Sequence, residues 1–435
     1  MLKKREIFRQ CFDNFDFDKI VVYGNTDVER ILNMEGMIRS PHKVQAVINN
    51  AWCYLLAANL AAFFLMGTDK HRARRGRRRI LPDRAWAESI LAFLIRHAII
   101  LHRGGDVQMK SKAAFNWCFI GAGTLANIVA KAILPSGRHR IAAVYTRRPQ
   151  KCREFAGKYG AAAYDSAEAA ISAPDVDGVY IVTPHTSHYE YAKLALSLGK
   201  PVLCEKPITV TAPEAAELFA LAAERTVYLA EAMWTWFSPV AQKVKQWYDA
   251  GELGALHRVE ARYHLDSRRY SARCTDPDLA GGALLDVGIY PITYLYRLFG
   301  KPVGVHCIGW LEGGIDLCED VTMSFSNGLT CTASVSICDF KGLEKVRLDG
   351  SKGRVRYYFF HNANRVKLVR KRGHSEVFKA DGGYLNEFDV VAGEIRDGLI
   401  QSLLVPPSAT TDVMEILDEC RRQMKLVYPF EKANT

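Results

Sequence analysis

Short apolar runs separated by amphipathic stretches occupy the chain from residue 113 to about residue 232. The runs have the length of strands, and the stretches between them, such as Leu125 to Leu134, have the spacing of helices. Strands that alternate with helices in this way predict a parallel, doubly wound sheet. The predicted strands are AFNWCFI (114–120), IAAVYT (141–146), GVYIVT (178–183), PVLCE (201–205) and TVYLAE (226–231).

Beyond these runs, apolar and polar positions alternate, which is the pattern of strands. A helix over about 238–250 precedes the alternating runs, and two helices near 385–402 and 409–426 follow them. Asn327-Gly328 lies between two alternating stretches and is a strong signal for a β-hairpin. The main runs are HRVEARYHLD (257–266), PVGVHCIGW (302–310), VTMSFSNGLTCTASVSI (321–337) and KVRLDGSKGRVRYYFF (345–360).

These patterns divide the chain into four parts. Residues 1–56 contain short helical segments, so we expect an all-α fragment there. Residues 57–112 combine an apolar run with an arginine block, and we expect a poorly structured basic connector. We predict an α/β Rossmann domain over 113–235 and an α+β domain with a mainly antiparallel sheet over 236–435.

Positive charge is concentrated in the first quarter of the chain. The formal net charge is +11, but residues 1–112 hold 20 Lys and Arg against 11 Asp and Glu, whereas the other 323 residues hold 38 against 36. With 49% hydrophobic and 24% charged residues the composition is that of a globular protein, which excludes a wholly disordered chain or a collagen repeat. The basicity is therefore local and indicates two parts of different character.

The cysteines and the start of the chain bear on the cellular compartment. Eleven cysteines are scattered without a CxxC pair, which fits reduced thiols better than disulfides or a zinc site. No cluster of His, Cys, Asp and Glu has the spacing of metal ligands. Lys3, Lys4 and Arg5 open an amphipathic stretch rather than a signal peptide. We therefore expect a cytoplasmic protein that holds no metal.

One apolar stretch, from Ala51 to Gly67, has to be compared with a transmembrane helix. It is interrupted only by Asn59, and the basic run KHRARRGRRR at 70–79 follows it like a positive-inside flank. Its length is at the short limit for a membrane span. We therefore favour a soluble helix and expect no membrane partner.

Gly121-Ala122-Gly123-Thr124-Leu125-Ala126 forms a GxGxxA motif directly after the first predicted strand and at the start of a helix. In this setting the first glycine permits a tight turn, the second lets a pyrophosphate approach the backbone, and the alanine lets helix and strand pack closely. The helix N-terminus adds free N–H donors and positive potential. The motif therefore predicts dinucleotide binding.

The residues after the second predicted strand bear on the choice of cofactor. NAD-binding domains commonly place Asp or Glu there to bind the ribose hydroxyls. This chain has Thr146-Arg147-Arg148, and a guanidinium pairs with a 2′-phosphate that a carboxylate would repel. We therefore predict NADP(H) in preference to NAD(H). The alternative is that both arginines are merely solvated surface residues.

Two further segments carry side chains suited to proton transfer. Cys204-Glu205-Lys206-Pro207 ends a predicted strand, and Asp286 and Tyr290 lie four residues apart, hence on one face of a helix. A nearby ammonium lowers the pKa of a phenol from about 10 towards the working pH. A lysine, a carboxylate and a tyrosine thus suit reversible proton transfer at a carbinol or carbonyl. The alternative is a structural, hydrogen-bonded Tyr at a helix start.

Several motifs in the right order resemble one known family. FIGAGTLA, the TPHTSHYEYAKLALSLGKPVLCEKPIT stretch (183–209) and GGALLDVGIYPITYL (281–295) are similar to the glucose–fructose oxidoreductase/inositol dehydrogenase/MocA (Gfo/Idh/MocA) family. The similarity runs from about residue 113 to residue 431. EAMWTWFSP (231–239), with Tyr in place of the commoner His at 290, resembles the branch of dimeric dihydrodiol dehydrogenases and NADP-dependent D-xylose dehydrogenases. Ala280 departs from that branch, which more often has glycine there, and this puts the shape of the turn in doubt.

This resemblance implies a role for each matching residue. Lys206 would lie near the nicotinamide and polarise the substrate oxygen, Tyr290 would be the general acid/base, and Asp286 would orient the substrate and the catalytic pair. Trp234 and Arg273 would line the substrate pocket. A homodimer through the C-terminal sheet is also implied. The expected cofactor-binding residues are Gly121, Gly123, Thr124, Leu125, Ala126, Thr146, Arg147, Arg148, Thr183, Pro184, His185, His188, Glu205 and Lys206, with loop structure as the alternative for the two histidines.

Residues 2–56 resemble a second family. LKKREIFRQCFDNFDFDKI and DVERILNMEGMIRSPHKVQAVINNAWCYL are similar to the middle of DNA-3-methyladenine glycosylase I, a helical base-excision repair enzyme. That family's segment with the catalytic Glu and part of the zinc site, and its later cysteine and histidine region, have no counterpart here. A flipped base needs a pocket built from several helices, so we expect a truncated fragment without glycosylase activity.

Two functional hypotheses follow. The first is an NADP(H)-dependent oxidoreductase that transfers a hydride between nicotinamide and a carbinol or carbonyl of a sugar, polyol or trans-dihydrodiol. The second is a DNA-binding or base-excision repair protein fused to a dehydrogenase domain, since the basic run at 70–79 attracts phosphate without sequence specificity.

Overall fold

The computed structural model divides the chain into two compact units, Met1–Arg103 and Gly104–Thr435. In the first unit only Arg30 and Ile31 are described, and both are helical. The expectations for the amino-terminal fragment, the connector, the apolar stretch and the basic run therefore lie outside the described residues. The described residues are 30–31, 113–267, 272–339 and 343–432.

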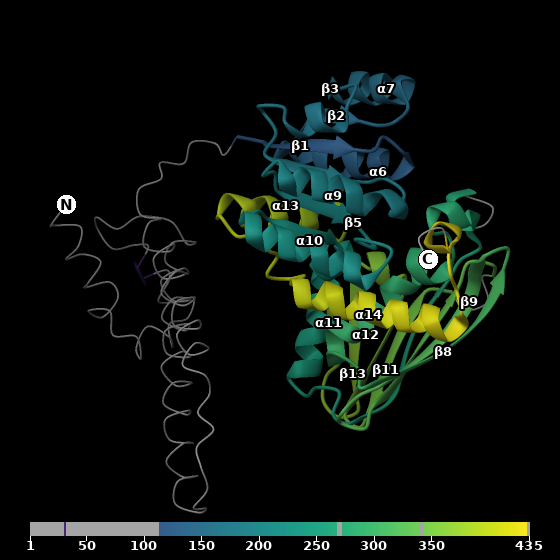
Figure 1. Ribbon diagram of the computed structural model, residues 1–435. Helices are drawn as coiled ribbons and strands as arrows, with labels where there is room; N and C mark the ends of the chain where they lie inside the picture. Colours follow the sequence, from purple (N-terminus) through teal and green to yellow (C-terminus); the bar gives the residue numbers. More distant parts are fainter. Residues whose placement is uncertain (1–29, 32–112, 268–271, 340–342, 433–435) are drawn as a thin grey trace, which may run out of the picture. The chain divides into compact units, whose positions relative to one another are not determined.

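The predicted parallel sheet is confirmed in the first half of the second unit (Figure 1). Its strand order is β3-β2-β1-β4-β5-β6, and all neighbouring strands are parallel. Because the order reverses between β1 and β4, a crevice opens at the carboxyl ends of these two strands. The strands are β1 (Phe115–Ile120), β2 (His139–Tyr145), β3 (Ala162–Ala163), β4 (Gly178–Ile181), β5 (Val202–Glu205) and β6 (Leu229–Ala232).

Helices between these strands bury one apolar face each against the sheet. In the first of them Ala126, Val129, Ala130 and Ile133 are buried, a spacing that forms one stripe along the helix. The last begins with a capping box at Thr211, which holds its entry point. The helices are α6 (Thr124–Ile133), α7 (Pro149–Tyr159), α8 (Ala167–Ile171), α9 (His188–Ser197) and α10 (Ala212–Arg225).

The second sheet has eight strands in the order β14-β13-β12-β11-β7-β10-β9-β8. It is antiparallel except for the pair β7 and β10, which confirms the mainly antiparallel prediction. The predicted hairpin joins β9 to β10, with Gly328 at a φ of +80°. The strands are β7 (Leu256–His264), β8 (Gly304–Glu312), β9 (Ile315–Ser324), β10 (Thr330–Ser336), β11 (Lys345–Gly350), β12 (Gly353–Tyr358), β13 (Arg365–Arg370) and β14 (Glu376–Lys379).

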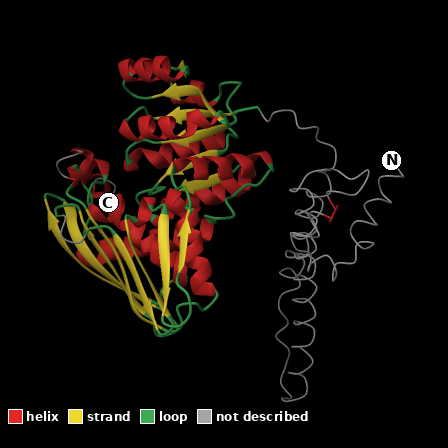
Figure 2. Cartoon of the chain, turned by 180° about the vertical axis from the view of Figure 1, so that it is seen from behind, coloured by secondary structure: helices red, strands yellow, loops and turns green. Residues whose placement is uncertain are grey.

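Helices gather on one face of this sheet and leave the other face to its own side chains (Figure 2). Alternation along β11 places Val346 and Leu348 in the core beneath the helices and turns Arg347 to the outer face. Within the described residues, none of the helices is long and apolar enough to cross a membrane. The helices of this half are α11 (Pro239–Asp249), α12 (Ile289–Phe299), α13 (Tyr384–Arg396), α14 (Pro407–Met424) and α15 (Pro429–Lys432).

One helix of the C-terminal region packs on the first sheet instead of the second. The ring of Phe388 in α13 lies 4.9 Å from the ring of Trp117 in β1 and 5.0 Å from the ring of Tyr180 in β4. Further on, the backbone N–H of Leu229 in β6 donates to the carbonyl of Ile400 at 3.2 Å. The two sheets are thus tied together by a segment that is distant in sequence from the first.

Candidate active site

The glycine turn after β1 has the geometry of an anion cradle. Gly121 has a φ of +116°, and a Cβ added there would lie 2.5 Å from the carbonyl oxygen of Val182, so only glycine fits. A Cβ added at Gly123 would meet no atom within 4 Å, which leaves open space above the turn. Gly123 caps α6 without a side-chain hydrogen bond, so the first N–H groups of the helix remain available to a phosphate.

A cavity of about 230 Å³ extends from this turn towards the end of β2. Arg147, Arg148 and Lys151 line it, and none of the described residues that line it is Asp or Glu. Lys151, in the first turn of α7, was not predicted from the sequence, although its position four residues after Arg147 was a usable signal. Three cations and no carboxylate fit a dinucleotide that carries an additional phosphate on its ribose.

A second cavity of about 410 Å³ adjoins the first and shares Gly123, Thr183 and Pro184 with it. The two together form one crevice that runs from Arg147 to Lys206. Apart from Ala126, which packs beneath the turn, all of the expected cofactor-binding residues border one cavity or the other. The second cavity is also bordered by Thr124, Leu125, His185, His188, Glu205, Lys206 and Arg273.

Lys206 is placed by the end of β5, where a cis peptide bond joins it to Pro207. Its Nζ donates to the backbone carbonyl of Asp286 at 2.6 Å and lies 3.9 Å from Oδ1 of the same residue. The same Nζ lies 4.7 Å from the centre of the Tyr290 ring. Burial lowers the pKa of Lys206, while the Asp286 carboxylate acts in the opposite direction. The structure thus brings together the three residues expected to do chemistry.

Asp286 lies in a short π-helix, Leu284–Gly288, that leads into α12. Its Oδ1 accepts a hydrogen bond from Nη2 of Arg273 at 2.6 Å, and its Oδ2 lies 3.1 Å from the thiol of Cys274, which donates to it. Burial raises the pKa of Asp286, but the charges of Lys206 and Arg273 outweigh that effect and hold the pKa below its usual range. Asp286 is therefore an ionised carboxylate that fixes two cations.

Tyr290 differs from the expectation in its electrostatics. Burial raises its pKa well above 10, so the prediction that a nearby ammonium lowers this pKa was wrong. The reason is orientation: Lys206 lies over the ring, and the hydroxyl oxygen accepts a hydrogen bond from Nε1 of Trp234 at 3.1 Å. Neither Tyr290 nor Trp234 borders the two cavities.

An aromatic cluster surrounds Tyr290. Trp234 stacks on Tyr384 with ring centres 4.7 Å apart and meets the ring of His361 at 5.4 Å. Tyr263 stacks on His361 at 5.4 Å and lies 5.6 Å from Tyr290. Tyr263, His361 and Tyr384 come from β7, the segment after β12, and α13, so no local spacing pointed to them.

The two histidines of the predicted set have different environments. His185 accepts a hydrogen bond from Arg273 at its Nε2 (3.2 Å), and burial lowers the pKa of His185, so the ring is neutral. The ring of His188 lies between the carbonyl oxygens of Pro207 (2.8 Å) and Thr183 (2.9 Å), and burial lowers its pKa to about 4. Both carbonyl contacts of His188 are with the loops that border the crevice, so it supports their shape.

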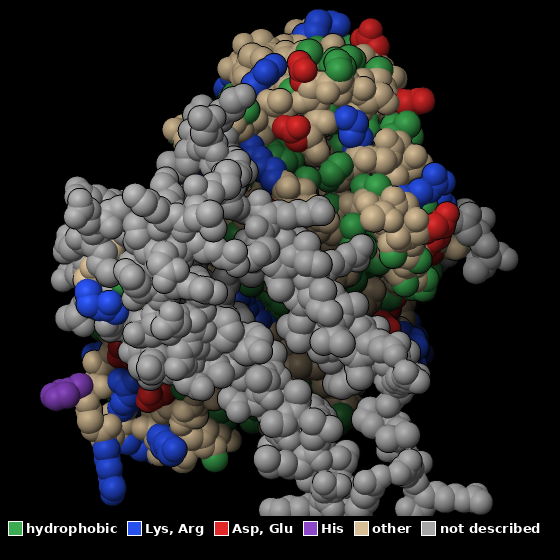
Figure 3. Space-filling view, turned by 90° about the vertical axis from the view of Figure 1, so that its left-hand side faces the viewer, with side chains coloured by type: hydrophobic (Ala, Val, Ile, Leu, Met, Phe, Trp, Pro, Cys, Tyr) green, Lys and Arg blue, Asp and Glu red, His purple; other side chains and the backbone are tan. Residues whose placement is uncertain are grey.

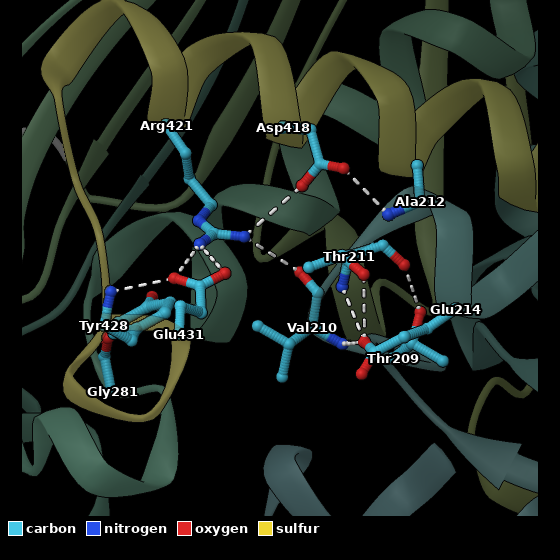
Figure 4. Close-up of polar contacts among 10 residues, drawn as sticks. All are labelled: Thr209, Val210, Thr211, Ala212, Glu214, Gly281, Asp418, Arg421, Tyr428 and Glu431. Atoms are coloured by element: carbon cyan, nitrogen blue, oxygen red, sulfur yellow. Dashed lines mark hydrogen bonds and ion pairs between the residues drawn. The ribbon is translucent and has the colours of Figure 1, made fainter. Parts of the chain in front are cut away.

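The buried Arg421 links helix α14 to α15 and to the loop that follows β5 (Figure 4). Arg421 in α14 donates to Glu431, to Asp418 and to the backbone carbonyl of Val210. The hydroxyl of Tyr428, on which Arg421 also lies, donates to the carbonyl of Gly281 at 3.0 Å. This network holds Gly281, in the segment before the π-helix, close to Val210, in the loop that follows Lys206. Among the described residues, no group of three or more His, Cys, Asp or Glu side chains is arranged to bind a metal ion.

Three family models match the chain. A model described as an oxidoreductase family with an NAD-binding Rossmann fold matches residues 115–232, and a model of the GFO/IDH/MocA C-terminal domain matches residues 241–356. A model of methyladenine glycosylase matches residues 1–78, most of which lie outside the described residues.

Two characterised relatives align with nearly their whole length. The NADP(+)-dependent D-xylose 1-dehydrogenase of Hypocrea jecorina is 30% identical over 362 residues, which cover 72% of this chain and 93% of that protein. The trans-1,2-dihydrobenzene-1,2-diol dehydrogenase of Mus musculus is 32% identical over 337 residues, which cover 73% of this chain and 99% of that protein.

Solved structures share the fold. A 3-ketoreductase from Actinomadura kijaniata, solved with NADP and TDP-benzene, matches with a TM-score of 0.65 at 23% identity, over 72% of this chain and 98% of that one. An aldose-aldose oxidoreductase from Caulobacter crescentus, solved with glycerol, matches with a TM-score of 0.65 at 20% identity, over the same shares.

Proposed function

The chain belongs to the Gfo/Idh/MocA family of oxidoreductases, and from this premise we propose that it is an NADP(H)-dependent dehydrogenase. The observation that supports the proposal most directly is that the glycine turn, the Arg147–Arg148 pair and Lys206 all border the same crevice. The turn suits the pyrophosphate, the arginines suit a 2′-phosphate, and Lys206 stands at the other end, where the nicotinamide would lie.

In the proposed reaction, each side chain at the Lys206 end of the crevice has a separate role. A bound nicotinamide supplies or accepts the hydride. Lys206, which borders the crevice, donates a hydrogen bond to the substrate oxygen and polarises it. Tyr290 holds a proton because burial raises its pKa, so it suits the role of the acid that completes carbonyl reduction. Asp286 fixes Lys206 and Arg273 through its charge and its hydrogen bonds.

The proposed substrate is a sugar, a polyol or a trans-dihydrodiol. The names of the two aligned relatives support this range, and Lys206 and Arg273, which border the crevice, supply hydrogen-bond donors for hydroxyl groups. The test is a panel of aldoses, polyols and cyclic diols with the purified full chain and NADP, followed by cofactor reduction. The proposal predicts turnover with at least one class and would be contradicted by a panel without any turnover.

We also propose that the enzyme is a homodimer through the outer face of the second sheet. Ile308 and Trp310 on β8 are 66% and 59% exposed there, although both are large and apolar. Replacing Trp310 by Lys should therefore convert the dimer to a monomer in sedimentation velocity. Leu403→Lys, at a 55% exposed apolar residue outside the sheet, is the control and should leave the dimer intact. A monomeric wild type, or a Trp310→Lys variant that stays dimeric, would contradict this.

The match of residues 1–78 to methyladenine glycosylase favours a second candidate function, affinity for DNA. We propose that residues 1–78 bind DNA without excising bases. Incubation of the chain with alkylated DNA tests this, and release of 3-methyladenine would contradict it. A salt-dependent DNA shift would support simple phosphate binding by the basic run at 70–79.

A further inference from the structure

Two buried carboxyl groups of β9 lie against the short π-helix that carries Asp286. In the space-filling view, Asp and Glu side chains lie scattered over the described part of the surface, where water solvates them (Figure 3). Asp316 and Glu319 are instead only 0% and 3% exposed. Burying a carboxyl group is costly unless the group is paired or neutral. The mechanism proposed above uses neither residue, so their position needs another explanation.

A β-bulge brings both carboxyl groups to the same face of the sheet. Residues three apart on a regular strand point to opposite faces. The register between β8 and β9 skips Leu317, which lies between the two acidic residues. This one extra residue turns Asp316 to the face of Glu319, which is the face that the helices cover. Bulges are frequent next to active sites, where they redirect a side chain.

Asp316 binds the start of the π-helix. Its Oδ2 accepts a hydrogen bond from the backbone N–H of Leu284, the first residue of that helix, at 2.5 Å. N–H groups at the start of a helix have no partner within the helix, so Asp316 acts as a cap supplied by a strand. A Cβ added to Gly282 would overlap Oδ1 of Asp316. The chain that enters the π-helix therefore rests directly on this carboxyl group.

Glu319 lies against the other end of the same helix. A Cβ added to Gly288 would be 2.9 Å from Oε1 of Glu319. Within the described residues, no backbone N–H, hydroxyl or amide donates to either oxygen of Glu319, and its hydrogen bond is with the carboxyl group of Asp316. Burial raises the pKa of Glu319 well above 4.5, and the charge of Asp316 raises it further. Glu319 is therefore protonated and donates to Asp316, because two carboxyl groups that share a site do not both ionise.

From these contacts we propose that Asp316 and Glu319 are positioning residues, which share one proton and support the π-helix at both of its ends. Asp286 lies in the middle of that helix and contacts Lys206. Tyr290 is the second residue of α12, which continues directly from it. Neither acidic residue borders the crevice, so the pair acts through Asp286 and Tyr290. This inference rests on the proposed dehydrogenase function.

The test compares two variants of the full chain that differ in one hydrogen bond. Glu319→Gln keeps a neutral donor to Asp316, whereas Glu319→Met has a similar length and no donor. With the substrate found in the panel, Glu319→Gln should keep kcat within about twofold of wild type. Glu319→Met should lower kcat by about 10- to 100-fold, the effect of a small displacement of a catalytic group.

The cofactor provides the internal reference for this comparison. The dissociation constant for NADP should stay within about twofold in both variants, because Glu319 does not border the crevice. Glu224→Met makes the same exchange at a 74% exposed position on α10 and should leave kcat unchanged. A loss of kcat that is specific to Glu319→Met, without a loss of NADP affinity, is the result expected of a positioning residue.

Two further measurements need no substrate. In amide hydrogen exchange, peptides that cover residues 281–290 should exchange faster in Glu319→Met than in wild type and Glu319→Gln. In the infrared difference spectrum at neutral pH, wild type should show the C=O band of a protonated carboxyl group that Glu319→Gln lacks. The infrared measurement decides the proposal even where Glu319→Met does not fold.

The proposal is overturned if Glu319→Met keeps the kcat and the exchange rates of wild type, or if Glu319→Gln is as impaired as Glu319→Met. It is also overturned if the difference spectrum lacks the band of a protonated carboxyl group. A wild type without turnover on the whole panel contradicts the proposed function instead. In that case the exchange rates and the infrared spectrum still show whether this pair supports the π-helix.

Discussion

The protonation states of Lys206, Asp286 and Tyr290 follow from where each side chain points. Asp286 is ionised because two cations contact it, and Tyr290 stays protonated because its hydroxyl is buried beside Trp234. The sequence identified these residues by type and spacing, but the direction of a pKa shift depends on which atom faces the charge. Spacing alone could not show that Lys206 would lie over the ring of Tyr290 and away from its oxygen.

Tyr290→Phe removes the proposed proton donor and keeps the ring beneath Lys206. We expect turnover to fall by about 100-fold or more, the usual loss for a general acid, while the dissociation constant for NADP stays within about twofold because Tyr290 borders neither cavity. Steady-state kinetics and a fluorescence titration of the cofactor measure the two effects. Wild-type turnover in Tyr290→Phe would remove Tyr290 from the mechanism.

The double variant Arg147→Ala/Arg148→Ala tests the choice of cofactor. It should raise KM for NADP by roughly 100-fold or more, since each of the two arginine–phosphate contacts contributes about 1.5–3 kcal/mol, and should leave KM for NAD nearly unchanged. Arg153→Ala, on α7 but outside the cavity, is the matched control. Equal KM values for NADP and NAD in the wild type would show that the arginines are solvated surface residues.

Among the elements of the fold, the turns and strands could be predicted from short stretches of sequence. The backbone angles of a single turn decide the Asn327-Gly328 hairpin and the Gly121 turn, so short motifs predicted both. Contacts between distant elements were not predictable in this way. The packing of Phe388 against β1, and the meeting of Tyr263 with His361, depend on how separate elements dock.

Glu231, at the end of β6, makes the free energy of unfolding depend on pH. It accepts hydrogen bonds from the N–H of Ile208 and the hydroxyl of Thr410 in α14, and burial raises its pKa to about 7. A carboxyl with a raised pKa stabilises the fold below its ordinary value of 4.5 and loses that contribution as the pH rises through 7. The loss amounts to roughly 3 kcal/mol of unfolding free energy by pH 8.

Urea unfolding of wild type and Glu231→Gln at pH 5 and pH 8 measures this contribution. Between pH 5 and pH 8 the wild type should lose roughly 3 kcal/mol of unfolding free energy. Glu231→Gln should not show this loss, because glutamine does not titrate. Glu224→Gln, at an exposed position on α10, is the control and should show no such change. Parallel behaviour of wild type and Glu231→Gln would contradict the raised pKa.

At the scale of the molecule, the described unit combines a cofactor crevice on one sheet with an outer face on the other. The sequence predicted both sheets, because strand patterns and family motifs are spread along residues 113–431. The pairing of Arg347 with Arg356 on the second sheet was not predicted, since they meet only through the register of β11 and β12. The net charge of +11 likewise gave no hint of this pairing, because most of that charge belongs to residues 1–112.

The central claim is that a hydride passes between the nicotinamide and the substrate in the crevice bordered by Lys206. The most direct measurement is a single turnover with NADPH deuterated at the transferred position of its nicotinamide, comparing wild type with Lys206→Met on the carbonyl form of the best substrate from the panel. The account predicts that wild type delivers deuterium to the new carbinol carbon, and that Lys206→Met still binds NADPH but transfers it at least about 100-fold more slowly. Oxidation of NADPH without label in the product, or equal transfer by both proteins, would contradict it.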